Sequence, residues 1–345
     1  MAKVKVIAVD LAKHTFQVCL FDRRMNVLSN RAMSRNQLAR LLARQSPAVM
    51  ALEACGGAHH VGRMAQRHGH QVRMLAPRQV KAFRQGQKHD GNDALAIGVA
   101  SQQPTVKAVA VKTLEAQALQ CSKRLQEHLS DQLTATGNLL RAMLAEFGHV
   151  IAKGAGGLKR RVPELLEDGE NNLPMAARQS LAQAWQLWQY QAEQLKAAER
   201  QLAAHGSQID ACRRLQALEG VGIKNAIGLY NRLSEATQFK NGREASACVG
   251  LTPQQHSSGG KVQLGGIGRY RGDRRLRSSL IVGSRALVNA LKRRAPRTAT
   301  EQWLVGVINR RGPGRAAVAL ANRIVRVAWA MVRDGSEYQP RPLAA

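Results

Sequence analysis

The sequence predicts a multidomain protein, with an α/β domain first and mainly helical domains after it. Over residues 1–112, short β-branched runs alternate with helical patterns. Residues 113–207 contain two long stretches with apolar residues at helical spacing, separated by a basic insert. Residues 208–345 contain shorter helical patterns around a Gly-x-Gly turn. We therefore expect three domains, with boundaries near residues 112 and 207.

The first domain is expected to begin with three antiparallel strands. In chain order its elements are strands at 3–10, 15–21 and 27–32, a helix from Ser34, a strand at 48–53, a helix at 59–68, a strand at 71–75, a short basic helix through Phe83 and a helix opened by Asp90. Ser34 is a suitable N-cap, since Leu38, Leu41 and Leu42 follow it at helical spacing. This order of elements is typical of RNase H-like or RuvC-like domains.

Carboxylates stand at the ends of the predicted strands and at the start of the last helix. Asp10 and Glu53 each end an apolar run, and Asp90 and Asp93 lie on one face of a helix. A single carboxylate at a strand end is as often a cap of the next turn as a ligand. Four matching acids, however, favour one shared site at the carboxyl edge of the sheet.

The middle region predicts two long helices. Residues 114–147 and 176–205 keep helical period without proline, and the Gly- and Lys/Arg-rich insert 153–161 lies between them. The two helices could pair as an antiparallel coiled coil or pack in a simpler bundle, because strict heptads are not sustained. Trp185 and Trp188 are expected to be packing residues.

The last region offers candidate contacts to nucleic-acid phosphates. A helix-hairpin-helix-like turn at Gly220-Val221-Gly222 would point backbone amides at a phosphate, or its glycines would only let two helices pack closely. A basic run follows at residues 269–277, although such a run often does no more than cover a solvent-exposed surface. The candidates are Gly220, Gly222, Lys224, Lys261, Arg269, Arg271, Arg274, Arg275 and Arg277.

A serine pair followed by two glycines is the remaining candidate for chemistry. After a helix and a turn at Pro253, the stretch Ser257-Ser258-Gly259-Gly260 is expected to form a loop that exposes a hydroxyl. On pattern alone, an ordinary surface loop is the commoner explanation.

Composition narrows the partners. The formal charge of +29, from 52 Lys and Arg against 23 Asp and Glu, implies a polyanion, and nucleic acid is favoured over a membrane. A membrane is the weaker choice because no apolar stretch approaches the ~18 residues of a spanning helix and no signal sequence opens the chain. Five scattered cysteines predict neither a zinc site nor a disulfide framework, which fits a reducing cytoplasm.

The ordered set of motifs resembles the DEDD transposases of insertion sequences, which are relatives of the Piv DNA invertase and include the bridge-RNA-guided recombinases. The matching segments are Val9-Asp10-x-Ala12-Lys13, Leu52-Glu53-Ala54-x-Gly56, Lys88-x-Asp90-x-x-Asp93-Ala94, Gly220-Val221-Gly222, and Gly250-Leu251-Thr252-Pro253 leading to Ser258-Gly259. They extend over most of the chain.

This resemblance implies a bacterial, nucleoid-associated transposase with three parts. A RuvC-like domain would hold Mg²⁺ or Mn²⁺ through Asp10, Glu53, Asp90 and Asp93, a coiled coil would follow, and a last domain would carry a nucleophilic serine, placed at Ser258 by the Ser-Gly match. Ser257 is its rival by pattern. The implied partners are donor and target DNA, a noncoding guide (bridge) RNA, and further copies of the chain in a dimer or tetramer.

Two alternatives remain open. A RuvC-like structure-specific nuclease would use metal-activated water and would need no serine. A basic RNA-binding protein with an RNase H-like fold would need no acids. The four acids disfavour the second alternative, and the Gly-Leu-Thr-Pro/Ser-Gly segment disfavours the first.

Overall fold

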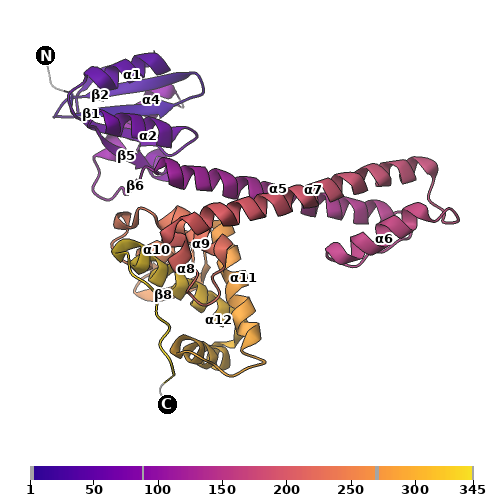
Figure 1. Ribbon diagram of the computed structural model, residues 1–345. Coiled ribbons are helices and arrows are strands. Elements are labelled where there is room, and N and C mark those ends of the chain that lie inside the picture. Colours follow the sequence, from indigo (N-terminus) through magenta and orange to yellow (C-terminus); the bar gives the residue numbers. More distant parts are fainter. Residues whose placement is uncertain (1–3, 88, 269–271, 344–345) are drawn as a thin grey trace. The chain divides into compact units, whose positions relative to one another are not determined.

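The computed structural model describes residues 4–87, 89–268 and 272–343. The chain divides into two compact units, Met1–Leu114 and Glu115–Ala345, and each is described in turn (Figure 1). No helix within these described ranges has the length and apolarity needed to cross a membrane.

The described part of the first unit is built on one six-stranded sheet. Its strands are β1 (Val6–Leu11), β2 (Thr15–Phe21), β3 (Val27–Ser34), β4 (Val49–Glu53), β5 (Gln71–Leu75) and β6 (Ala108–Val109), in the spatial order β3-β2-β1-β4-β5-β6. The first three strands pair antiparallel, while β4 runs parallel to β1 and β5 runs parallel to β4. The predicted meander and the predicted alternation are therefore confirmed. The sequence did not reveal β6, because two residues carry no alternating pattern.

Helices cover both faces of this sheet. They are α1 (Arg35–Arg44), α2 (Ala58–Arg67), α3 (Pro77–Val80), the short turn η1 (Lys81–Phe83) and α4 (Asp90–Ser101). Alternate residues of β1 face opposite sides, so Ile7 packs in the core with α1 and α2, and Val6 packs in the core with α4. Ser34 caps α1 as predicted, since its Oγ accepts a hydrogen bond from the Gln37 amide.

Close packing fixes the position of α4 on the sheet. A Cβ added at Gly98 would lie 2.3 Å from the buried ring of Phe21 on β2. Glycine at this point lets the helix approach the strand, and a larger residue would force the two apart. The same helix carries Asp90 and Asp93 in its first turn.

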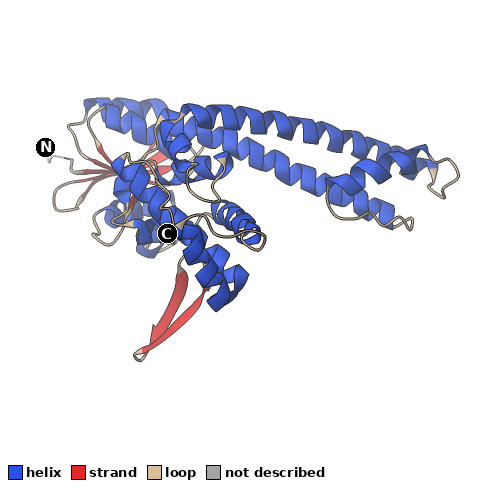
Figure 2. Cartoon of the chain, turned by 60° about the horizontal axis from the view of Figure 1, so that its bottom comes forward, coloured by secondary structure: helices blue, strands red, loops and turns tan. Residues whose placement is uncertain are grey.

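The second unit begins with a long antiparallel helix pair. Helices α5 (Leu114–Ala145) and α7 (Met175–Gln208) lie side by side, and α6 (Ala155–Glu167) lies near the turn between them (Figures 1 and 2). The three helices share a core that includes Leu140, Leu158 and Trp188. The rings of Trp185 and Trp188 stack with centroids 5.1 Å apart inside this core, which confirms their predicted packing role. The basic insert forms the start of α6.

The rest of the second unit is a helical bundle with one hairpin. Its elements are α8 (Asp210–Leu215), α9 (Ile223–Leu233), η2 (Ala236–Gln238), α10 (Gly242–Val249), β7 (Pro253–Ser258), β8 (Lys261–Ile267), α11 (Arg274–Ala290) and α12 (Ala299–Asp334). Helices from α8 to α12 share one hydrophobic core, which includes Val325 and Trp329. The C-terminal helix is thus structural support.

The predicted loop around the two serines is wrong: the segment is a β-hairpin. Strands β7 and β8 pair antiparallel, with Ser258 opposite Lys261, and they extend away from the helices (Figure 2). Gly259 and Gly260 form the two-residue turn with φ values of 55° and 75°, a conformation that glycine adopts without strain. The Gly-Gly pair signals such a turn, but flanking strands poor in apolar residues concealed it.

Candidate active site

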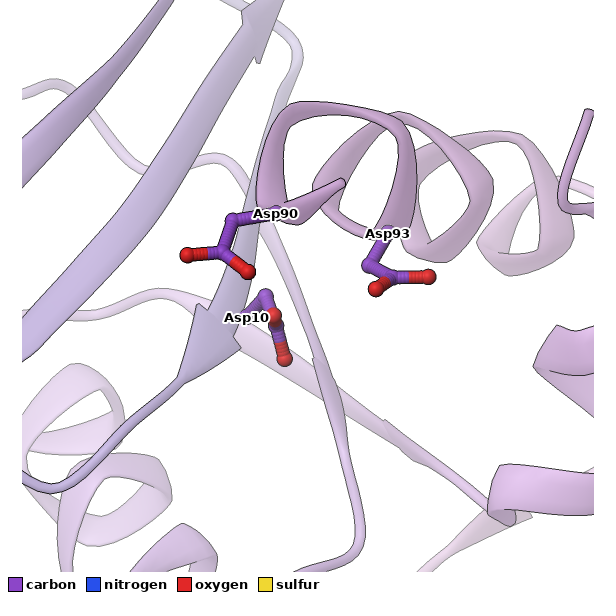
Figure 3. Close-up of side chains that lie close together, drawn as sticks. All are labelled: Asp10, Asp90 and Asp93. Atoms are coloured by element: carbon purple, nitrogen blue, oxygen red, sulfur yellow. The ribbon is translucent and has the colours of Figure 1, made fainter. Parts of the chain in front are cut away.

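Three carboxylates meet in the first unit (Figure 3). Asp10 extends from β1, and Asp90 and Asp93 extend from the first turn of α4. One carboxylate oxygen from each residue lies within 4.8 Å of the other two. The helix begins at Asp90 because the preceding His89 acts as its N-cap, with Nδ1 accepting a hydrogen bond from the Gly91 amide at 3.1 Å.

Glu53 stands beside this group on the neighbouring strand. Since β4 is parallel to β1 with Leu52 opposite Val9, the next residues along the two strands are Glu53 and Asp10. Burial raises the pKa of Glu53, and the negative charges of Asp10 and Asp93 raise it further. The four acids singled out in the sequence therefore lie close enough to influence one another.

Arg84 is a member of the site that sequence reasoning missed. Its Nη1 lies 3.4 Å from Oδ1 of Asp93, and its charge acts on Glu53 to lower the pKa. Nothing in the sequence distinguishes Arg84 from the other basic residues around it. It supplies one positive charge to a group of four carboxyls.

The donor set fits a hard divalent cation. All the groups that converge are carboxylates, and oxygen ligands suit Mg²⁺ and Mn²⁺. Carboxylates this close repel one another when they are ionised, and one arginine offsets that repulsion only in part. The residues present are therefore able to hold such a metal.

We expect Glu53→Gln to stabilise the metal-free protein at neutral pH. The raised pKa of Glu53 means that its charged form is disfavoured in the folded state. This destabilisation is present above the folded-state pKa and disappears as the pH falls below the ordinary value for glutamate. In EDTA at pH 7.5, removing the charge should raise Tm by about 1–3 °C, with no gain near pH 4. Thermal unfolding at the two pH values measures this.

Two comparisons sharpen that measurement. Asp22→Asn is the matched control outside the cluster, and hydrogen bonds from Asn26 lower the pKa of Asp22, so its neutralisation should reduce Tm instead. Adding Mg²⁺ should stabilise the wild type more than Glu53→Gln. A lower Tm for Glu53→Gln in EDTA, or equal stabilisation of both proteins by Mg²⁺, would contradict the assignment of Glu53 to the site.

The charge of the first unit is unevenly distributed. Residues 1–114 contain 18 Lys and Arg but only five acids, namely Asp10, Asp22, Glu53, Asp90 and Asp93. Three of the five acids thus form the carboxylate cluster and Glu53 lies beside it, while the unit as a whole is strongly basic. This arrangement suits a site that holds a cation while the rest of the unit contacts a polyanion.

The two serines belong to the exposed hairpin of the second unit. Ser258 ends β7 and Ser257 precedes it, and both are exposed. The Ser257 hydroxyl accepts a hydrogen bond from Nε2 of Gln255 at 2.9 Å. Successive strand residues point to opposite faces, so the two hydroxyls lie on different sides of the hairpin.

The Gly-x-Gly turn lies between α8 and α9, as expected. Gly220 has a φ of 80°, and a Cβ there would lie 3.1 Å from the carbonyl oxygen of Gly283 on α11. Close packing alone therefore explains this glycine. Gly222 is the N-cap of α9, and Lys224 forms an ion pair with Glu199 on α7.

The basic candidates differ in their surroundings. Arg275 donates to Asp131 at 2.6 Å, and Arg277 is buried with Nη1 donating to the carbonyl oxygen of Val249 at 3.1 Å. Lys261 and Arg274 are exposed. Arg269 and Arg271 lie outside the described residues. Arg275 is exposed as well, but its guanidinium is bonded to Asp131, so Lys261 and Arg274 are the candidates of this segment best placed to contact a phosphate.

Known proteins resemble the chain over its whole length. Residues 7–149 match a family model for transposases of the DEDD, IS110 type, and residues 212–299 match one described as the transposase IS116/IS110/IS902 family. A "Probable family 20 transposase" of Pseudomonas aeruginosa is 36% identical over 97% of this chain and 98% of its own length. The "Transposase for insertion sequence element IS1111A" of Coxiella burnetii is 33% identical over 98% of this chain and 92% of its own. The "Transposase for insertion sequence element IS1328" of Yersinia enterocolitica is 32% identical over 98% and 99%.

Proposed function

Because the chain belongs to the IS110 family of insertion-sequence transposases, we propose that it recombines DNA through a serine nucleophile, with a noncoding RNA selecting the DNA. As a transposase it is an enzyme that cuts and rejoins DNA. The proposal concerns how it does so. The observation that carries its metal-dependent part is that Asp10, Asp90 and Asp93 meet in the first unit with Glu53 beside them. The serine part is supported by the exposed Ser258 that follows the Gly-Leu-Thr-Pro segment.

The first unit is proposed to be a RuvC-like domain that holds Mg²⁺ or Mn²⁺. Support comes from the strand order and from the position of Asp10, Glu53, Asp90 and Asp93. A divalent cation bound there would offset the negative charge that develops on a scissile phosphate. The chain itself positions the ligands. Close packing of Gly98 against the Phe21 ring fixes α4 on the sheet, and the ion pair with Arg84 orients the Asp93 side chain.

Ser258 is proposed to be the nucleophile. It lies at the tip of an exposed hairpin, where its hydroxyl is accessible to a DNA backbone. Attack on phosphorus would link the protein to DNA through a phosphoserine, and the energy of the broken phosphodiester would be kept for rejoining. Recombination would then need no ATP.

Guidance by RNA and assembly into a dimer or tetramer complete the proposal. The charge of +29 and the basic surface of the first unit provide for extended contact with a nucleic-acid backbone. Within the second unit, the pair of long helices is proposed to be a coiled-coil domain and residues 208–345 a separate transposase domain. A neighbouring copy would be able to supply one half of a composite site.

One experiment tests the proposed function. We expect the full-length protein, purified in moderate salt, to carry one noncoding RNA encoded beside its own gene, since a folded guide makes many contacts. This complex, incubated with labelled DNA and Mg²⁺, should give a protein-linked DNA species that survives denaturing electrophoresis. Random cellular RNA fragments would contradict guidance, and hydrolysed DNA ends without attached protein would favour a water-using nuclease.

A further inference from the structure

The hairpin that carries Ser258 has two chemically different faces. Strand residues alternate, and the register pairs Ser258 with Lys261 and His256 with Gln263. One face therefore presents His256, Ser258, Lys261 and Gln263. The other presents Gln255, Ser257, Val262 and Leu264. The Ser258 face is entirely polar, whereas Val262 and Leu264 on the opposite face are 68% and 64% exposed.

The groups on the Ser258 face lie within reach of one another. Directly opposed residues of an antiparallel pair have Cβ atoms about 4.5–5.5 Å apart, which places the Lys261 stem beside Ser258. His256 is two residues before Ser258 on the same strand and face, about 6.5 Å away along the strand. Both side chains are exposed, and neither forms an ion pair or a side-chain hydrogen bond with the described part of the chain. They are thus available to a substrate.

The hairpin contains no negatively charged side chain that would repel a phosphodiester. Residues 253–267 include no Asp or Glu, and His256 and Lys261 are the titratable side chains of these two fully described strands. A phosphodiester approaching this face would meet only hydroxyl, amide, imidazole and ammonium groups. The Ser257 hydroxyl, by contrast, is on the apolar face and already bonds to Gln255.

We propose that His256 is the general base for Ser258 and that Lys261 holds the phosphate under attack; this rests on the proposed function of Ser258. The proton of the Ser258 hydroxyl passes to the imidazole as the bond from Oγ to phosphorus forms. The bond from phosphorus to the leaving sugar oxygen breaks, and that oxygen gains the proton, directly or through water. No proton, electron or further reactant is left over. The Lys261 ammonium contacts a non-bridging oxygen and offsets its charge.

The test is the rate of covalent protein–DNA formation by the full-length protein with its RNA and labelled DNA, followed from pH 5.5 to 8.5. We expect His256→Gln to be about 100-fold slower or more, and to lack the fall in rate at low pH that a general base predicts for the wild type. Added imidazole should partly restore His256→Gly. We expect Lys261→Ala to raise the DNA concentration for half-maximal rate, and Lys261→Arg to restore it.

Matched controls separate chemistry from folding of the hairpin. Gln255→Ala and Val262→Ala each remove a side chain from the opposite face of the same hairpin; both should react within about threefold of the wild type. Wild-type rates and an unchanged pH profile for His256→Gln, together with no adduct from Ser258→Ala, would overturn the role of His256 and leave the proposed function standing. A normal adduct from Ser258→Ala would overturn both.

Discussion

We expect Asp10→Ala and Asp93→Ala to abolish DNA strand exchange, with rate losses of about 1,000-fold or more. Each substitution removes one of three carboxylates whose oxygens lie within 4.8 Å of one another, so the remaining acids no longer complete the site. RNA binding should be almost unchanged, because it depends on the basic surface. A recombination assay in Mg²⁺ and a filter-binding assay with the copurified RNA measure the two effects.

Asp22→Ala provides the matched control for these variants. Asp22 is the one acid of residues 1–114 apart from the cluster and Glu53, so its loss changes the charge of the first unit by the same amount. Its carboxylate accepts hydrogen bonds from Arg24 and Asn26 in a surface turn. Recombination should stay within about twofold of the wild type. Normal strand exchange by either cluster variant would refute the metal site, and equal inactivity of Asp22→Ala would show that net charge matters instead.

The second large effect is expected for Ser258→Ala. If its hydroxyl attacks DNA, the variant should lose both recombination and every covalent protein–DNA species, while still binding RNA and DNA. Only one exposed oxygen is removed, so neither folding nor the basic surface should change. Denaturing gels with end-labelled DNA reveal the adduct.

Ser257→Ala is the natural comparison because it removes the same group one residue away. Its hydroxyl lies on the other face and bonds to Gln255, so we expect a loss of less than about tenfold. Persistent cleavage by Ser258→Ala with unattached, hydrolysed ends would favour the nuclease alternative. An adduct lost only in Ser257→Ala would move the nucleophile by one residue.

The order of elements in the first unit could be predicted because its signals are local. The buried run that ends at Asp10 and the N-cap at Ser34 depend on neighbouring residues alone. The convergence of the acids was also predictable in outline. Parallel strands end at one edge of a sheet, and Asp90 and Asp93 are three residues apart on a helix.

Contacts between residues distant in sequence were beyond such reasoning. Arg84 contacts Asp93 because the short turn η1 before it places the arginine beside the start of α4. No sequence pattern distinguishes Arg84 from the other basic residues nearby. Lys224 pairs with Glu199, and Arg277 is buried against Val249, so exposure could not be read from a run of charges. Gly220 packs closely against the backbone of α11, so a side chain at this position would be too close to it. The Gly-x-Gly pattern alone does not reveal this contact.

The two-residue turn of the hairpin has a consequence for insertions and deletions. Since side chains alternate with a period of two, adding or removing one residue before the turn would exchange the faces of Ser257 and Ser258. To keep the same hydroxyl beside the same neighbours, a homologue or an engineered variant must change the strand length in steps of two residues. Length is the more tightly constrained property of this segment, and alignments that place gaps within it would misassign the serine.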